Sequence, residues 1–232
     1  MYIDILDLEV EDFLYKKLEK YLEILLFWQR SLNLISNDTI TNAWQRHFYD
    51  SLQLIKEIKA VEESKKETLP RDNTQNISSE SLNVFDLGSG AGFPGLVLAV
   101  IDTKNKYYLI ESNSKKTAFL SEIVRVLELK NVIVVNKRIE DFSKENIKAD
   151  IILSRGLTKL DSLVDSARMF SKQDSVCIFL KGQNYLQEID GLNSKNKSLV
   201  NQISANQECN LKVSVKQSLT NHDSKIIIVE NI

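Results

Sequence analysis

The segment Asp86–Gly95, which reads Asp-Leu-Gly-Ser-Gly-Ala-Gly-Phe-Pro-Gly, constrains the fold more than any other stretch of the chain. The apolar pair before it, Val84 and Phe85, is typical of a buried strand. Glycines at alternate positions let the backbone turn sharply and come close to a ligand. Proline suits the first turn of a helix because that position needs no amide hydrogen, so Pro94 predicts a helix over 94–101. We therefore predict a strand, a ligand-binding loop and a helix in succession.

The residues of this loop exclude two common nucleotide-binding motifs. The dinucleotide fingerprint requires a third glycine where Phe93 stands, and the Gly-Lys-Ser/Thr of a P-loop does not occur. Asp86 would repel a pyrophosphate, but it suits a ligand with cationic groups, such as the ammonium and sulfonium of S-adenosylmethionine. Glu111, at the end of the next predicted strand, is placed to accept hydrogen bonds from a ribose diol. The alternative is a tight turn that binds no ligand, and the two acids count against it.

From Leu82 onward, predicted strands and helices alternate. Strands are predicted at 83–87, 106–111, 131–136, 149–154, 174–180, 209–216 and 225–230, and helices at 94–101, 114–128, 159–171 and 183–189. This alternation predicts an α/β fold with a doubly wound, mostly parallel sheet of seven strands. Since no helix separates the last two strands, we expect them to form a hairpin-like pair with one antiparallel strand.

The chain of 232 residues is long enough for one domain with a small appendage. Helical periodicity predicts a long helix over 8–30 and a second helix over 39–59, so that residues 1–61 form an N-terminal helical cap. The polar stretch 62–81 predicts a linker or a surface insertion. Residues 82–232 then form the main domain.

The formal net charge of −2 does not indicate a nucleic-acid-binding protein by itself. Residues 104–138, however, hold eight Lys or Arg against three acids, which fits either an RNA-facing patch or a solvated helix face. The chain shows neither a signal peptide nor an apolar run of about 18 residues, so we expect a soluble, cytoplasmic protein that does not contact membranes. Cys177 and Cys209 are expected to be packing thiols, and we predict no metal site.

Polar residues and glycines follow the predicted strands at the edge where ligands bind in such sheets. The third strand is followed by Arg138–Asp141, whose acid pair suits either an adenine amine or the start of the next helix. The fourth strand ends in Ser154-Arg155-Gly156 and the fifth in Lys181-Gly182. Together with the glycine loop and Glu111, five strand ends predict one site.

The end of the fourth strand restricts the methyl acceptor. It carries neither the Pro-Pro-aromatic motif of amine methyltransferases nor a cysteine that could attack a pyrimidine carbon. Arg155 stands there instead, and it can stack on a purine, bind guanine O6 or a phosphate, or contact the carboxylate of the cofactor. Guanine N7 has a lone pair and no proton, so positioning can replace a general base. His47 is expected to be packed or hydrogen-bonded between the cap and the sheet rather than to act as a base.

These motifs give the chain its family resemblance. It resembles the bacterial small-subunit ribosomal RNA methyltransferase G family (glucose-inhibited division protein B) over nearly its whole length. The resemblance implies a class I S-adenosylmethionine-dependent methyltransferase that makes 7-methylguanosine in 16S rRNA. The matching elements are Trp28 with Asn33–Ser36, Arg46-His47 with Asp50-Ser51, Phe85–Gly95, Glu111-Ser112 with Lys115-Lys116 and Phe119-Leu120, Arg138–Asp141, Ser154–Gly156 and Leu180–Gly182.

The resemblance also implies which residues bind each ligand. Arg155 is predicted to be catalytic, and Arg46, His47 and Lys181 are predicted to face the acceptor. The expected partner is 16S rRNA or a precursor of the small ribosomal subunit, with no obligate protein partner. Two alternatives stay open, namely a methyltransferase of small molecules and a cofactor-binding regulatory or RNA-binding module without catalysis. The predicted cofactor-binding residues are Asp86, Gly88, Gly90, Gly92, Phe93, Glu111, Ile139, Glu140 and Arg155.

Overall fold

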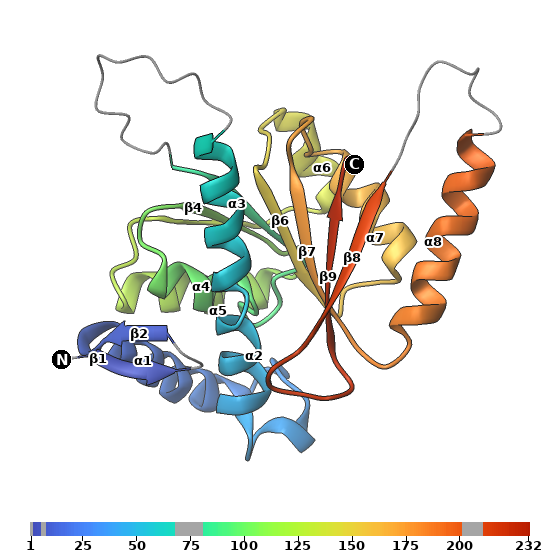
Figure 1. Ribbon diagram of the computed structural model, residues 1–232. Coiled ribbons are helices and arrows are strands. Elements are labelled where there is room, and N and C mark those ends of the chain that lie inside the picture. The colour runs from blue at the N-terminus through green and yellow to red at the C-terminus, as the bar shows by residue number, and fades with distance from the viewer. Residues whose placement is uncertain (1, 6–7, 68–80, 201–210) are drawn as a thin grey trace, which may run out of the picture.

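The computed structural model describes residues 2–5, 8–67, 81–200 and 211–232. Seven strands form one sheet in the order β5-β4-β3-β6-β7-β9-β8 (Figure 1). The strands β5, β4, β3, β6 and β7 are parallel to one another, and β9 is antiparallel to both of its neighbours, β7 and β8. This arrangement confirms the predicted doubly wound, mostly parallel sheet and the antiparallel pair at its end. The bounds are β3 Asn83–Leu87, β4 Lys106–Ile110, β5 Val132–Val135, β6 Ile151–Arg155, β7 Val176–Lys181, β8 Lys212–Gln217 and β9 Lys225–Glu230.

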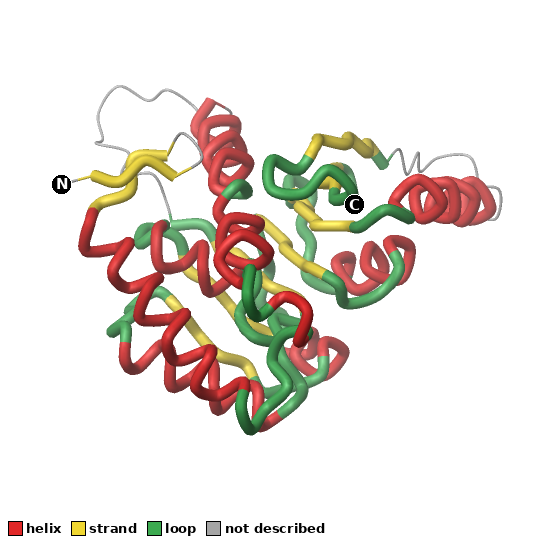
Figure 2. Tube along the Cα trace, turned by 90° about the horizontal axis from the view of Figure 1, so that it is seen from below, coloured by secondary structure: helices red, strands yellow, loops and turns green. Residues whose placement is uncertain are grey.

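Helices cover both faces of the sheet, which Figures 1 and 2 show from two sides. Since strand side chains alternate between the two faces, Val84 and Leu153 pack against α3 and α4, whereas Phe85 and Phe179 pack against α7 and α8. The central strands β3, β4, β6 and β7 are therefore buried on both sides. The helices are α1 Asp12–Gln29, α2 Asp50–Leu52, α3 Ile55–Glu67, α4 Gly95–Ile101, α5 Ser114–Val126, α6 Ile139–Phe142, α7 Leu160–Arg168 and α8 Tyr185–Val200.

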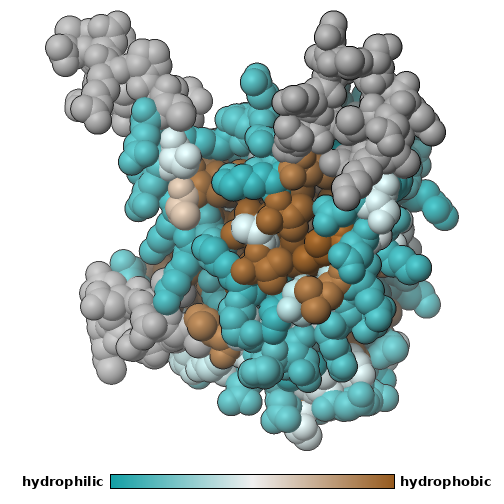
Figure 3. All heavy atoms as spheres, turned by 45° about the vertical axis from the view of Figure 1, so that its right-hand side comes forward, coloured by the Kyte–Doolittle hydropathy of each residue, from teal (hydrophilic) through white to brown (hydrophobic). Residues whose placement is uncertain are grey.

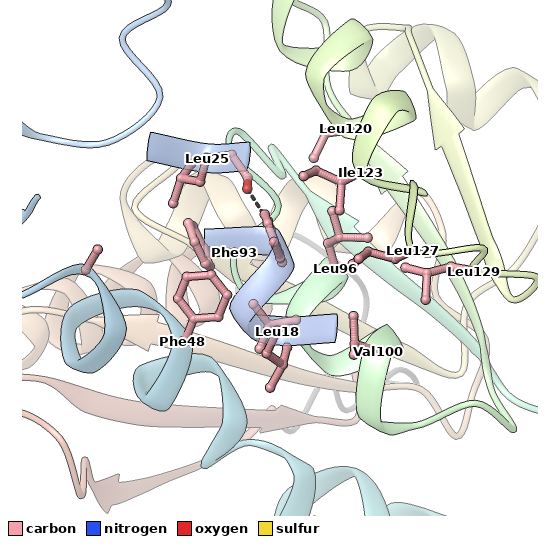
Figure 4. Close-up of a cluster of buried hydrophobic side chains, with 14 of the residues drawn as sticks. Leu18, Leu25, Phe48, Phe93, Leu96, Val100, Leu120, Ile123, Leu127 and Leu129 are labelled. Carbon is pink, nitrogen blue, oxygen red and sulfur yellow. Dashed lines mark hydrogen bonds between the residues drawn. The ribbon is translucent and has the colours of Figure 1, made fainter. Parts of the chain in front are cut away.

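The first helix of the cap packs directly on the main domain. Leu18 and Leu25 of α1 lie in one buried cluster with Leu96 of α4 and Ile123 of α5 (Figure 4). Burial of large apolar side chains is the main source of folding free energy. The contact between α1 and the rest of the molecule is therefore a core contact and not a loose association of two parts.

The N-terminal segment differs from the prediction at its start. The helix predicted over 8–30 begins at Asp12, because Leu8–Glu11 forms a strand, β2, which pairs antiparallel with β1 (Tyr2–Ile5). The four residues before Asp12 thus use their backbone groups for strand pairing.

The second predicted helix, over 39–59, is also wrong as a single element. The chain forms a 3₁₀ turn, then a π-helical turn at Trp44–Tyr49, then α2 and α3. The break has a local cause at Gln53, whose side-chain amide donates to the Asp50 carbonyl at 2.9 Å. Leu54 N–H donates instead to the Ser51 carbonyl at 3.1 Å, so the regular α-helical ladder ends there.

The predicted linker 62–81 begins later than expected, because α3 continues to Glu67. Two ion pairs hold the end of this helix, since Glu62 pairs with Lys104 at 3.4 Å and Lys65 pairs with Asp150 at 3.2 Å. Residues 62–67 are therefore helical, and residues 68–80 of the predicted linker lie outside the described residues.

Most side chains on the face in Figure 3 are hydrophilic, and they border one apolar patch. Within the described ranges, no helix is both long and apolar enough to cross a bilayer. Cys177 is fully buried in β7, as expected for a packing thiol, and Cys209 lies outside the described residues.

Candidate active site

Two adjacent cavities open at the carboxyl ends of the parallel strands. The first, which we call the glycine-loop cavity, has a volume of about 380 Å³, and its walls include Gly88, Gly90, Glu111, Ile139 and Glu140. The second, which we call the cap cavity, has a volume of about 210 Å³, and its walls include Arg46, His47 and Lys181 together with residues of the β8–β9 loop. Arg155 and Gly156 belong to both cavities.

The glycine loop after β3 presents bare backbone to the first cavity. Gly88 has φ +71°, which L side chains rarely adopt, and an added Cβ would come within 2.5 Å of Leu157 Cδ1, so a side chain there would strain the backbone and displace Leu157. Gly90 has φ +57° with open space beside it, and the nearest atom to an added Cβ is the Gly88 carbonyl oxygen at 3.8 Å. A ligand can therefore approach the main chain at Gly90.

The carboxylate of Glu111 is fixed at the floor of this cavity. Its Oε2 accepts from Gly90 N–H at 3.0 Å, and its Oε1 accepts from Asn113 N–H at 2.8 Å. Each carboxylate oxygen has a further lone pair, so the group can still accept hydrogen bonds from two hydroxyls. A ribose diol has two hydroxyl donors, so it fits this carboxylate. The half-buried Ile139 adds an apolar wall, and the exposed Glu140 lies beside it.

Asp86 does not line the glycine-loop cavity, in contrast to the prediction. It lies on the α4 side of β3, where its Oδ2 accepts from Gly95 N–H at 3.0 Å, and the side chain is fully buried. Among the described residues, its Oδ1 has no hydrogen-bond partner. Burial raises the pKa of Asp86 to about 7, although the Gly95 hydrogen bond acts in the opposite direction. The carboxyl group thus joins β3 to the first residue of α4.

Gly92 and Phe93 also face the cap rather than the glycine-loop cavity. A Cβ at Gly92 would come within 2.9 Å of Leu96 Cβ, which leaves no room for a side chain. Phe93 is 4% exposed and lies between two rings of the cap. It stacks on His47 at 5.0 Å and 24°, and on Tyr21 at 5.8 Å and 7°. These two loop residues therefore connect the loop to the cap.

Arg155 is a fixed, largely buried cation between the two cavities. Its Nη1 donates to the Arg46 carbonyl at 3.0 Å and pairs with Asp50 Oδ2 at 3.4 Å, and its Nη2 donates to His47 Nδ1 at 2.8 Å. The guanidinium carbon lies 5.1 Å from the centre of the Phe93 ring. Burial lowers the pKa of Arg155, and the charge of Asp50 opposes this effect. The arrangement differs from an exposed ion pair, since the side chain is only 21% exposed.

His47 has both ring nitrogens occupied. Arginine can only donate, so His47 Nδ1 accepts from Arg155 and Nε2 carries the proton. Nε2 then donates to Thr39 Oγ1 at 2.9 Å, whose own hydroxyl donates to the Ser36 carbonyl at 2.7 Å. Burial, together with the charges of Arg155 and Arg46, lowers the pKa of His47 to about 3. The ring is therefore neutral near pH 7 and has no free lone pair for a proton.

Lys181 and Arg46 line the cap cavity in different ways. Lys181 is 7% exposed, and its ammonium donates to the Thr158 carbonyl at 2.6 Å and pairs with Glu188 at 2.6 Å. Its charge thus holds the start of α8 near the β6–α7 loop. Arg46, in contrast, is exposed at the cavity.

Residues that the sequence analysis missed complete the cap cavity. Asp50 Oδ1 accepts from Gln53 Nε2 at 2.9 Å and from Thr220 Oγ1 at 2.7 Å, so Asp50 joins Arg155 to the β8–β9 loop. The matching pattern Arg46-His47 with Asp50-Ser51 contains Asp50, which is a signal for its role. No local pattern marks the loop residues, which are Thr220, Asn221 and Ser224.

A further cavity, of about 370 Å³, lies between α3 and the strands β7, β8 and β9. Its walls include Lys65, Asp174 and Val176, which place it at the amino end of β7. None of the predicted site residues lines it. The candidate active site is therefore the pair of cavities at the carboxyl ends of the strands.

Comparisons with known proteins give one consistent family. The family model for rRNA small subunit methyltransferase G matches residues 14–69 and 72–219. Ribosomal RNA small subunit methyltransferase G from Gluconobacter oxydans (strain 621H) is 39% identical over 175 residues, which cover 75% of this chain and 78% of that protein. The protein of the same name from Rickettsia akari (strain Hartford) is 32% identical over 225 residues, or 97% of this chain and 98% of the relative.

Among solved structures, the chain is similar to Aeropyrum pernix fibrillarin in complex with natively bound S-adenosyl-L-methionine. The TM-score is 0.50 and the sequence identity is 15%, and the match covers 65% of this chain and 66% of the fibrillarin chain. At this identity the likeness supports the fold, and the assignment of the site depends on the residues described above.

Proposed function

Because this chain belongs to the rRNA small subunit methyltransferase G family, we propose that each of its two cavities binds one of the two substrates of methyl transfer. The protein transfers a methyl group from S-adenosylmethionine to N7 of a guanosine in 16S rRNA. The glycine-loop cavity binds the cofactor, the cap cavity binds the guanine, and Arg155 lies where they meet.

The residues of the glycine-loop cavity suit the cofactor. When bound, S-adenosylmethionine supplies a methyl group on a positively charged sulfur. The backbone at Gly88 and Gly90 gives it close access, Glu111 accepts from the ribose hydroxyls, and Ile139 with Glu140 binds the adenine. The volume of about 380 Å³ is within the usual range of small-molecule sites, about 300–1,000 Å³.

The cap cavity suits guanine because two arginines line it. Arg46 and Arg155 can only donate, and the oxygens of Asp50 already accept from Gln53, Thr220 and Arg155. Guanine presents two acceptors on its major-groove edge, N7 and O6, whereas adenine presents an amino group beside N7. A cavity lined by these two arginines therefore favours guanine over adenine.

The chemistry of this site is positioning rather than proton transfer. N7 carries no proton, and His47 is neutral with both nitrogens in hydrogen bonds. Arg155 is held in one geometry by Arg46, His47 and Asp50, so it can orient a bound group without reorganising. Correct alignment of two reactants can lower a barrier by about 7–11 kcal/mol.

The observation that carries this proposal is that Arg155 is shared by both cavities, and Arg155→Ala tests it. We expect turnover of labelled S-adenosylmethionine on 16S rRNA or small-subunit particles to fall by about 100-fold, the cost of losing alignment. Arg155→Lys should also fail, because lysine lacks the planar fork of donors. The control is Arg168→Ala, an arginine of α7 that pairs with Asp165 and lines neither cavity. Near-native turnover of Arg155→Ala would refute the shared role.

We also propose where the RNA docks and in which compartment the protein works. Lys116, Lys137 and Arg138 belong to the basic stretch 104–138 and line the glycine-loop cavity, so RNA phosphates can approach there. With a net charge of −2, docking depends on this local patch, which suits 16S rRNA held in a precursor of the small subunit. Such a substrate places the protein in the cytoplasm.

A further inference from the structure

Tyr21 of α1 contacts the glycine loop from the side that faces the cap. Its side chain is fully buried, and its hydroxyl donates a hydrogen bond to the Ala91 carbonyl oxygen in the middle of the loop. The next residue, Gly92, has φ +90°, and an added Cβ would collide with the Tyr21 hydroxyl. The loop backbone and α1 are therefore in direct contact.

The ring of Tyr21 holds the same loop by stacking. It lies parallel to Phe93, at 5.8 Å and 7°, and edge-on to Phe48, at 5.1 Å and 70°. Phe48 and Phe93 lie beside Leu18 and Leu25 in the cluster that Figure 4 shows. Aromatic pairs of this kind add to the stability that burial provides. Tyr21 thus contacts both Ala91 and Phe93, on either side of Gly92.

No described residue of α1 lines the glycine-loop cavity, so Tyr21 can affect a ligand there only through the loop. The loop residues on its cavity side are Gly88 and Gly90, which populate many backbone conformations when unrestrained. A binding site that is ordered before the ligand arrives loses less conformational entropy on binding.

We propose that Tyr21 is a positioning residue for the cofactor, whose hydroxyl fixes the glycine loop in its binding conformation. This inference rests on the cofactor site proposed above. It gives the N-terminal cap a role in cofactor binding, in addition to its contribution to the cap cavity.

The test is Tyr21→Phe, which keeps the ring and removes the hydroxyl. Tyr107→Phe is a matched control, because Tyr107 is also fully buried and its hydroxyl donates to Asp102 at 2.8 Å, near the amino end of β4. Each variant removes one hydrogen bond of a fully buried tyrosine, so both should unfold at a lower temperature. Only Tyr21→Phe should weaken S-adenosylhomocysteine binding by calorimetry, by about tenfold, which equals about 1.4 kcal/mol.

Kinetics on rRNA supply a second readout. We expect the KM of Tyr21→Phe for S-adenosylmethionine to rise while kcat at saturating cofactor stays close to wild type. Unchanged affinity in Tyr21→Phe, or an equal loss in Tyr107→Phe, would overturn the inference.

Glu111→Ala separates this inference from the cofactor site on which it rests. If Tyr21→Phe weakens binding and Glu111→Ala does not, the ribose contact assigned to Glu111 is wrong and the role of Tyr21 stands. The reverse result leaves the cavity in place and rejects Tyr21 as a positioning residue.

Discussion

Asp86 and His47 are both buried, and the charge of Arg155 lowers the pKa of each. Burial raises the pKa of Asp86 from 3.8 to about 7, so the folded state holds this proton more tightly than the unfolded state. Its contribution to stability is therefore lost as the pH rises from about 4 through 7. Burial lowers the pKa of His47 from 6.5 to about 3, so its contribution is lost as the pH falls below about 6.5.

These opposite signs give a prediction for Asp86→Asn. Between pH 4 and 7 the two groups oppose each other in the wild type, and the variant removes the contribution that decreases with rising pH. The free energy of unfolding of Asp86→Asn should therefore rise more steeply with pH over this range than that of the wild type. Urea unfolding at several pH values measures this slope. Equal slopes in the two proteins would contradict the raised pKa of Asp86.

At the scale of single residues, the sequence predicted which positions gather near the site but not which way each side chain points. Parallel strands are buried on both faces and show no alternation of polar and apolar residues. Strand alternation puts Asp86 on the same face as Val84, but nothing in Val84-Phe85-Asp86 shows that this face lies toward α4. Glu111, in contrast, follows the last residue of β4, where the strand end itself directs it to the cavity.

At the scale of elements, the β8–β9 loop lines the cap cavity, and hydrogen bonds to residues of the cap hold this loop in place. Gln53 is 2% exposed, and it donates to Ser218 Oγ at 3.1 Å and accepts from Leu219 N–H at 2.8 Å. Thr220 adds the hydrogen bond to Asp50 at 2.7 Å. The loop lies beside α2 at the bottom of Figure 1, far from it in sequence.

Thr220→Val tests this wall with a side chain of nearly the same shape. Losing one hydrogen bond to a buried carboxylate should loosen the loop and raise the KM for rRNA by about tenfold, the effect of about 1.4 kcal/mol. Affinity for S-adenosylhomocysteine should not change, because Thr220 lines only the cap cavity of the two. Asp223→Ala, an exposed change in the same loop, is the control. A parallel loss of cofactor affinity would show that the loop has a different role.

Elements with a strong apolar period were predictable, and elements set by side-chain hydrogen bonds were not. The strands from β3 to β9 and the helix α5 lie close to their predicted positions. The break between α2 and α3 depends on one contact of Gln53 with the Asp50 carbonyl, which no propensity reveals. The helix α8 extends well beyond the predicted 183–189, to Val200, and Leu192 makes a buried contact within this extension.

At the scale of the whole molecule, the alternation of elements predicted the sheet, but no local pattern could show how the cap packs on it. The polar stretch 62–81 predicts a cap over 1–61 and a separate main domain over 82–232. The buried cluster around α1, however, takes side chains from both parts, including Tyr21 and Leu25 from the cap and Phe93 and Leu96 from the main domain. The polar stretch 62–81 does not show which apolar side chains on either side of it pack into one core.

We therefore expect the cap and the sheet to unfold together. Trp28 and Trp44, the two tryptophans of the chain, both lie in the cap, and the Trp28 ring lies 5.7 Å from that of Phe119 in α5. Their fluorescence therefore reports on the cap and its contact with the main domain, whereas far-UV circular dichroism reports on all helices and strands. In urea the two signals should give one coincident transition, because separating the cap would expose the shared core. S-adenosylhomocysteine at 100 times its Kd should shift both signals together, by about 2.7 kcal/mol. A fluorescence transition at lower urea, unmoved by this ligand, would mean that the cap is an independent unit and that the glycine loop does not depend on it.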